Sequence, residues 1–105
     1  MFTNYKNDFW SVLLRAKNEI AGLKDALING KIDGTKYEGE CACLKGTIAN
    51  IQHCNYKKIP GIKADASEPS EVWFMMMHPG MTPENSEVVK LTVEWIEEFE
   101  MYIKA

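Results

Sequence analysis

Hydrophobic residues near the N-terminus recur at steps of three and four, which places them on one face of a helix. They are Phe9, Val12, Leu13, Ala16, Ile20, Leu23 and Leu27. Asn7 or Asp8 suits the N-cap of such a helix, and Gly30 suits the left-handed residue just past its end. The pattern therefore predicts one long amphipathic helix over about 8–29. Trp10 and Leu14 lie off this stripe and indicate either a wide core face or a contact with a partner.

A second long stripe runs to the C-terminus. Its main positions are Val88, Leu91, Trp95, Phe99 and Tyr102. Thr82-Pro83-Glu84 precedes it with a capping residue, a proline for the first helical position and an acid near the positive end of the helix dipole. These signals predict a second long helix over about 83–103.

Two shorter apolar segments lie between the long helices. The first, 40–52, carries Leu44 and Ile48 at helical spacing beside small residues, which is typical of a buried central helix. The second, 72–77, is apolar without a period, and Pro69 just before it favours a short helix over a buried strand. The whole pattern predicts an all-α fold in which two long amphipathic helices pack around a short central helix and a short apolar segment.

Length and charge narrow the class of protein. With 105 residues, 46% of them hydrophobic, the chain suits one globular domain over 1–105. Its net charge of -3 argues against general binding of nucleic acid or anionic membranes, because both need a positive field. The chain has no apolar run of about 20 residues and no apolar core of a signal peptide near Met1. We therefore expect a cytoplasmic protein with no membrane partner and reduced cysteines.

The cysteines and histidines raise the question of a metal site. Cys41, Cys43, His53 and Cys54 contain the donors of a Cys₃His zinc site. If Cys41 and Cys43 lie on a helix, however, their spacing turns them about 200° apart. We therefore favour buried thiols that pack as small hydrophobes, with no metal and no cofactor, and keep a small zinc-binding domain as an alternative. Neither His53 nor His78 lies in a nucleophile motif, so we expect no enzyme.

The pattern predicts a long loop over 53–65, and long loops often carry the residues that bind partners. Tyr56, Lys57, Lys58 and Lys63 form a basic cluster with one aromatic ring in it. Such a cluster can meet phosphate and stack on a base, although a solvated loop fits an acidic chain better. We take these residues as candidate binding residues for a partner protein, with nucleic acid as the less favoured partner.

Four acids gather in the C-terminal half of the second long helix: Glu94, Glu97, Glu98 and Glu100. This is the unfavourable end of the helix dipole for negative charge. Either the acids form a solvated face or they meet a basic partner, in which case they can mimic phosphate toward a basic groove on a nucleic-acid-handling enzyme. We include them among the candidate binding residues.

Three motifs together resemble small proteins of bacteriophage and prophage genomes. They are Gly39-x-Cys41-x-Cys43-Leu44-x-Gly46-Thr47-Ile48-Ala49-Asn50, then Pro69-x-Glu71-x-Trp73-Phe74, then Thr82-Pro83-Glu84-Asn85. The resemblance implies a phage accessory protein in a bacterial cytoplasm, and no catalytic residue comes with it. Proteins of this kind often resemble inhibitors of host defence, anti-CRISPR proteins among them. The resulting hypothesis is a protein that binds a host protein and inhibits a defence system.

A second hypothesis comes from a different class. The chain could self-associate into an oligomer that binds a small ligand, with Trp73, Met75 and Tyr37 lining a pocket between subunits. Charge reversal at Glu97 and Glu98 separates the two hypotheses, because it should abolish partner binding and leave ligand binding intact.

Overall fold

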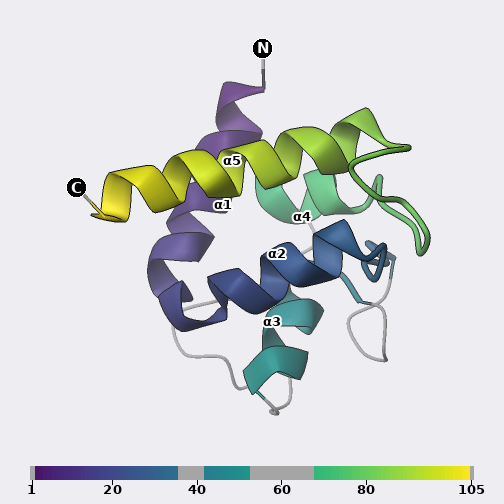
Figure 1. The fold of residues 1–105 in the computed structure, drawn as a ribbon, viewed down its shortest axis with the longest axis horizontal. Coiled ribbons are helices and arrows are strands. Elements are labelled where there is room, and N and C mark those ends of the chain that lie inside the picture. The colour runs from purple at the N-terminus through teal and green to yellow at the C-terminus, as the bar shows by residue number, and fades with distance from the viewer. Residues whose placement is uncertain (1, 36–41, 53–67, 105) are drawn as a thin grey trace.

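The computed structural model describes residues 2–35, 42–52 and 68–104 (Figure 1). Their helices are α1 (Thr3–Arg15), the 3₁₀ helix η1 (Lys17–Glu19), α2 (Ile20–Ile28), α3 (Leu44–Gln52), α4 (Pro69–Phe74) and α5 (Glu87–Lys104). Within the described ranges the only extended pairing is a single bridge between Ile32 and Ala42. The all-α prediction is confirmed.

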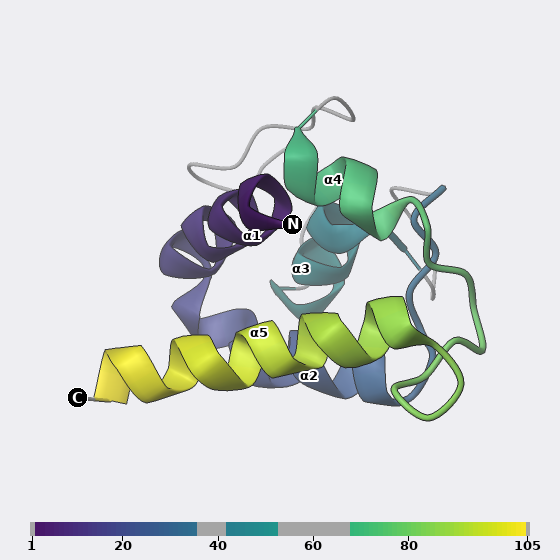
Figure 2. The same cartoon turned by 90° about the horizontal axis from the view of Figure 1, so that it is seen from above.

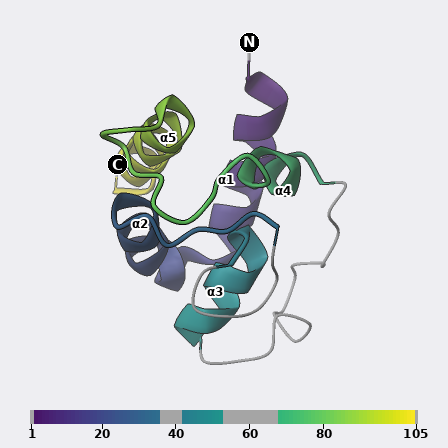
Figure 3. The same cartoon turned by 90° about the vertical axis from the view of Figure 1, so that its right-hand side faces the viewer.

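Helices α1 and α2 each contact α5 on one side and a further helix, α4 or α3, on the other. Helix α5 lies antiparallel along α2 and crosses α1 (Figures 1 and 2). On the other side, α1 packs against α4, and α3 packs against both α2 and α4 (Figure 3). Helix α2 is thus covered by α3 on one side and by α5 on the other.

The first long helix is broken, so the prediction of one helix over 8–29 is wrong. It begins at Thr3, and the chain leaves helical geometry at Ala16, where φ is -137° and ψ is 42°. The Ala16 N–H bonds the Leu13 carbonyl at 3.1 Å, which tightens the last turn of α1 before the chain changes direction. The physical reason lies in packing, since α1 faces α4 while α2 faces α3. Ala16 is small and buried, so the chain can turn there against the core.

The end of α2 follows the prediction. Gly30 has φ of 69°, the left-handed conformation that glycine adopts without a Cβ penalty. The N–H of Lys31 bonds the Ala26 carbonyl at 2.9 Å and the N–H of Gly30 bonds the Leu27 carbonyl at 3.4 Å. These two bonds make a Schellman motif.

The central helix begins at Leu44, later than the predicted start near 40. Ala42 is extended and accepts a hydrogen bond from the Asp33 N–H at 2.9 Å, so it pairs with the chain after α2 instead of joining the helix. The Cys43 Sγ then accepts the Gly46 N–H at 3.5 Å at the start of α3. Cys43 therefore precedes the helix. The argument that a helix would turn Cys41 and Cys43 about 200° apart assumed that both lie on a helix, so it does not apply.

Helix α5 begins at Glu87, so the predicted start at 83 is also wrong. The Asn85 Oδ1 accepts the Thr82 N–H at 2.8 Å, and the Thr82 carbonyl accepts the Ser86 N–H at 2.9 Å. These bonds hold residues 82–85 in a turn. The Ser86 Oγ then accepts the Val89 N–H at 3.3 Å, so Ser86 is the residue that caps the helix. Short polar side chains thus compete with the helix backbone here.

Segment 72–77 is helical through Phe74 and ends in a turn, which confirms the choice of helix over strand for its first half. Phe74 and Met77 are buried, whereas Met75 and Met76 are exposed. The Met77 carbonyl accepts the Gly34 N–H at 3.0 Å, so the chain after α2 packs directly on the backbone at the end of α4.

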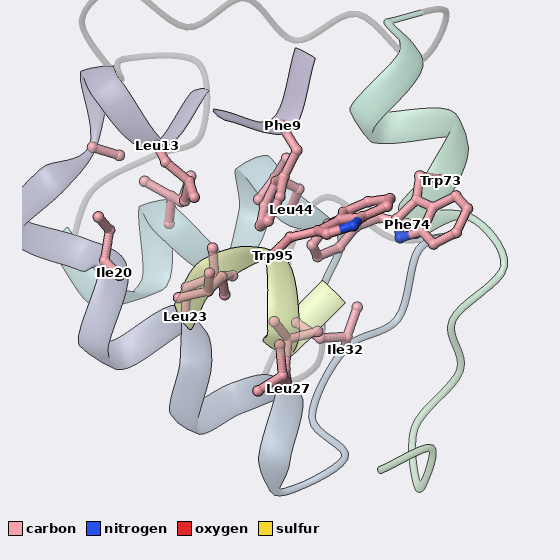
Figure 4. Packing of buried hydrophobic residues seen from close by; sticks show 14 of the residues in the cluster. Phe9, Leu13, Ile20, Leu23, Leu27, Ile32, Leu44, Trp73, Phe74 and Trp95 are labelled. Carbon is pink, nitrogen blue, oxygen red and sulfur yellow. The ribbon is translucent and has the colours of Figure 1, made fainter. Parts of the chain in front are cut away.

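The core lies where α1, α2, α3, α4 and α5 meet, and Figure 4 shows it from close by. Phe9 of α1 stacks on Phe74 of α4 at 5.5 Å between ring centroids and on Trp95 of α5 at 6.4 Å. Trp73 donates its indole N–H to the Thr92 Oγ1 at 2.7 Å. Every buried side-chain nitrogen or oxygen in the described part of the chain has a hydrogen-bond partner.

Candidate functional site

The acids predicted on the last helix lie along its C-terminal half and are partly paired within the chain. Glu94 and Glu97 are exposed, while Glu98 and Glu100 are half-buried. The Lys6 Nζ lies 2.9 Å from the Glu98 Oε2. Lys24 of α2 pairs with two more of the acids, Glu97 and Glu100. Two lysines therefore lie beside the four carboxylates of α5.

Lys24 pairs with two carboxylates of α5 at once. Its Nζ lies 3.3 Å from Glu100 and 3.4 Å from Glu97. Burial lowers the pKa of Lys24, but the hydrogen bonds and charges of Glu100 and then Glu97 outweigh this effect, so the net shift is upward. The acids thus fasten α5 to α1 and α2 as well as presenting negative charge to solvent. The sequence showed neither lysine as a partner, because the hydrogen-bonded pairs Lys6–Glu98 and Lys24–Glu100 join residues 92 and 76 positions apart in the chain.

The apolar C-terminal end of α5 is the most exposed hydrophobic surface of the described chain. The exposed fractions are 74% for Met101, 65% for Tyr102 and 44% for Ile103, and Leu14 of α1 is 56% exposed. Trp10, one turn before Leu14, packs edge-on against Tyr102 at 5.5 Å between ring centroids. Trp10 and Leu14, the two residues beside the first apolar stripe, therefore differ in their surroundings. Trp10 is half-buried against α5, whereas Leu14 faces solvent.

A second apolar surface surrounds α4. Phe2, Val72, Met75 and Met76 are each between 38% and 45% exposed. Trp73, in contrast, is 2% exposed and contacts Phe2, Tyr5 and Trp95. Its ring belongs to the core of this chain. Of the three residues suggested for a pocket between subunits, Met75 is exposed and Tyr37 lies outside the described ranges.

Several candidate residues lie outside the described ranges. They are Tyr37, Cys41, His53, Cys54, Tyr56, Lys57, Lys58 and Lys63. The interpretations of the basic loop and of a four-donor zinc site rest on them and stay predictions. His78 is exposed in the turn after α4. Among the described side chains, no three or more His, Cys, Asp or Glu form a group that could hold a metal ion.

A buried ionisable cluster lies where α4 meets the start of α3. Cys43 and Glu71 belong to two of the three sequence motifs, but nothing in the sequence pattern showed that they meet. The Glu71 Oε1 accepts the Lys45 backbone N–H at 3.0 Å, and the Cys43 thiol hydrogen-bonds the same carboxylate. Burial raises the pKa of Glu71, although these hydrogen bonds oppose the shift. Burial, with the charge of Glu71 second, raises the pKa of Cys43 to about 12. A protonated, buried thiol is a poor nucleophile, so the cluster does not suit catalysis by Cys43. Its hydrogen bonds instead join Glu71 of α4 to the start of α3.

Asp8 of α1 caps the start of α4 in the same way that Glu71 of α4 caps the start of α3. Its Oδ2 accepts the Ser70 N–H at 2.9 Å and the Ser70 hydroxyl at 2.5 Å. A carboxylate of α1 thus caps α4, and a carboxylate of α4 caps α3. Both caps complement the partial positive charge of a helix N-terminus. The sequence suggested Asn7 or Asp8 as the cap of the first helix, whereas Asp8 lies inside α1 and accepts hydrogen bonds from Ser70 of α4, 62 residues away.

Truncating Glu71 tests the second of these caps. Glu71→Ala removes the acceptor of a buried N–H, so we expect the free energy of unfolding to fall by about 1–3 kcal/mol. Glu71→Gln keeps an acceptor oxygen and is the matched control. Because burial favours the protonated carboxyl, the stability of the wild type relative to Glu71→Gln should decline as pH rises from near 4.5 through the raised pKa. Urea unfolding at several pH values measures both effects, and equal losses for Ala and Gln would contradict the capping role.

Comparison of the chain with protein-family models, curated proteins and solved structures found no match. None of the helices in the described ranges is both long enough and apolar enough to span a membrane. The candidate site therefore rests on the geometry of α5 and its neighbours alone.

Proposed function

We propose that this protein acts by binding a partner protein through the exposed C-terminal part of α5. The α5 surface consists of Glu94, Glu97, Glu98, Met101, Tyr102 and Ile103 with Leu14 of α1. The observation that carries the proposal is the exposure of three consecutive large apolar residues at 101–103 next to a row of carboxylates. The surface belongs to a helix that is fastened to α1 and α2 by the ion pairs of Lys6 and Lys24.

The composition of the α5 surface supports this function. Protein interfaces combine an apolar centre, enriched in Tyr and Met, with a polar rim. Met101, Tyr102 and Ile103 supply the centre, and Glu94 and Glu97 supply a rim of negative charge. A partner with a basic surface around an apolar contact would complement both parts.

The motif resemblance suggests the biological setting of such a binder. We propose a phage-type accessory protein that binds a host protein, with inhibition of a bacterial defence system as the expected consequence. Negative charge on a rigid helix resembles the phosphates of nucleic acid, so a nucleic-acid-handling enzyme is the kind of host protein that fits.

Charge reversal tests the proposed surface. We expect Glu94→Lys combined with Glu97→Lys to reduce capture of the host partner from a bacterial lysate by at least about tenfold, because like charges across an interface are strongly unfavourable. The matched control is Glu84→Lys combined with Glu87→Lys, which makes the same change in net charge near the other end of α5. Quantitative mass spectrometry of cross-linked complexes measures the capture. Equal capture by the α5-surface variant and the wild type would contradict the proposal.

A further inference from the structure

Four side chains where α1 crosses α5 form one continuous cluster. The Lys6 Nζ lies 4.8 Å from the centroid of the Trp10 ring and 2.9 Å from the Glu98 Oε2. Trp10 meets Tyr102 edge-on, with 5.5 Å between ring centroids and 67° between ring planes. The Glu98 carboxylate thus contacts the Lys6 cation, the cation contacts the Trp10 ring, and that ring contacts Tyr102.

Two members of the cluster are held in fixed positions. The Trp10 indole N–H donates to the Trp95 carbonyl at 3.1 Å, and the ring also packs edge-on against Phe99 at 5.5 Å. Tyr102 lies one turn after Glu98 on α5, and long side chains on a helix lean toward the preceding turn. Its ring is anchored on one side by Trp10 and remains 65% exposed.

The position of Lys6 shows what kind of group this cluster accepts. Its ammonium group satisfies an aromatic face and a carboxylate together, which is the environment that a cation prefers. The Glu98 side chain remains 42% exposed, and Glu94 lies one turn before it on the same row of α5. Negative charge and an exposed tyrosine ring are therefore still presented to solvent beside the position that Lys6 occupies.

We propose that Tyr102, Glu98 and Trp10 form an anchor site for an arginine side chain of the protein bound at the α5 surface. The inference rests on the proposed function and names the chemistry by which the partner is recognised. A planar guanidinium stacks on the exposed Tyr102 ring and directs its N–H donors at Glu98, with Glu94 within the same row. A lysine ammonium is a single point of charge with no plane to lay on the ring, so it gains less from the exposed Tyr102 than arginine does, and the site prefers arginine. Lys6 is an internal competitor, because its charge occupies one side of Glu98.

The test uses two blocked pentapeptides that differ only in carrying two arginines or two lysines between glycines. Binding to the full chain is followed by ¹⁵N chemical shifts. The exposed cation–π contribution predicts that Tyr102→Leu weakens the arginine peptide by about two- to fivefold. The same variant should weaken the lysine peptide less, because an ammonium cannot stack its plane on the ring. Tyr102→Phe should restore binding of the arginine peptide, and Met101→Leu is the matched control on the neighbouring exposed residue.

A second variant tests the competition. Lys6→Gln frees Glu98 and should strengthen binding of the arginine peptide, which a purely structural role of the cluster would not do. Equal affinity of the wild type for both peptides, or no loss on Tyr102→Leu, would overturn the arginine site. The α5 surface would survive that result if the Glu94→Lys and Glu97→Lys pair still abolished host-protein capture, so the two proposals fail separately.

Discussion

Phe9→Ala is expected to lower the free energy of unfolding by about 3–5 kcal/mol, the usual cost of deleting a buried aromatic ring. Phe9 is fully buried, and its ring contacts Phe74 of α4 and Trp95 of α5. Its ring therefore links α1 to both of these helices, and Figure 4 shows the three side chains near one another. Alanine would leave a cavity among groups that are already fixed by their own backbone contacts.

The measurement for Phe9 is urea unfolding followed by tryptophan fluorescence and by circular dichroism. Leu14→Ala, an exposed apolar residue on the same helix, is the matched control and should change stability by no more than about 0.5 kcal/mol. Losses of similar size for the two variants would show that α1 does not pack as described. A domain of this length has a total stability of about 5–15 kcal/mol, so Phe9→Ala should remove a large fraction of it.

Gly34→Ala should destabilise the protein by about 3 kcal/mol or more, the upper end of the range for overpacking. A Cβ at Gly34 would lie 1.8 Å from the Phe74 carbonyl oxygen and 2.4 Å from the Met75 Cα. Both neighbours are backbone atoms at the end of α4, so neither can rotate away. The chain after α2 would have to separate from α4 and lose the hydrogen bond from Gly34 to Met77.

Gly22→Ala is the matched control for Gly34. The three atoms nearest to its Cβ would all belong to the Ile51 side chain, with the flexible Cδ1 at 2.9 Å, and alanine favours a helix by about 1 kcal/mol over glycine. We therefore expect a small change of either sign, again read from the urea midpoint. A loss at Gly22 as large as that at Gly34 would indicate a general cost of replacing glycine and would contradict the close approach of residue 34 to α4.

The sequence predicted the apolar faces well and the ends of the helices poorly. Leu13, Ala16 and Ile20 are all buried, so the stripe that crosses the break at Ala16 is real. The stripe could not reveal the break because apolar spacing records which side faces the core and not whether the helix is continuous. Gly30 was correctly placed because a left-handed residue depends on local geometry alone.

The start of α5 shows why local signals can mislead. Thr82-Pro83-Glu84 fits a helix start in the sequence, whereas α5 begins at Glu87 with Ser86 as its cap. The hydrogen bonds from Asn85 to Gly80 and from the Thr82 N–H to Asn85 decide between these two starts, and they depend on the turn at Gly80, where φ is 94°. Turn geometry of this kind does not appear in hydrophobic spacing.

Long-range polar contacts were beyond the reach of the sequence. Asp8 and Ser70 are 62 residues apart, and Lys6 and Glu98 are 92 apart. The acidic row on α5 was found from the sequence, since charge along one helix face can be read directly. Its pairing with Lys6 and Lys24, and its position beside the exposed Tyr102, required the helices to be placed in space.

The pairing of these acids has a consequence for function. Lys6 and Lys24 neutralise part of the row, yet each also holds α5 against another helix. A binding surface built on such a helix is held in one orientation before the partner arrives, which reduces the entropic cost of association. Core packing through residues such as Ile96 and Phe99 also holds α5 in place, and a single partly exposed ion pair contributes at most about 1 kcal/mol, so the lysines can be replaced to study binding without unfolding the protein.

Hydrogen–deuterium exchange on the cross-linked complex with the captured host protein tests the central claim most directly. If the α5 surface binds the partner, slowed exchange should be confined to peptides covering residues 94–104 of α5 and the part of α1 around Lys6 to Leu14. Slowed exchange around Val72, Met75 and Met76 of α4, with none in residues 94–104, would place the interface on the other apolar surface and contradict the account.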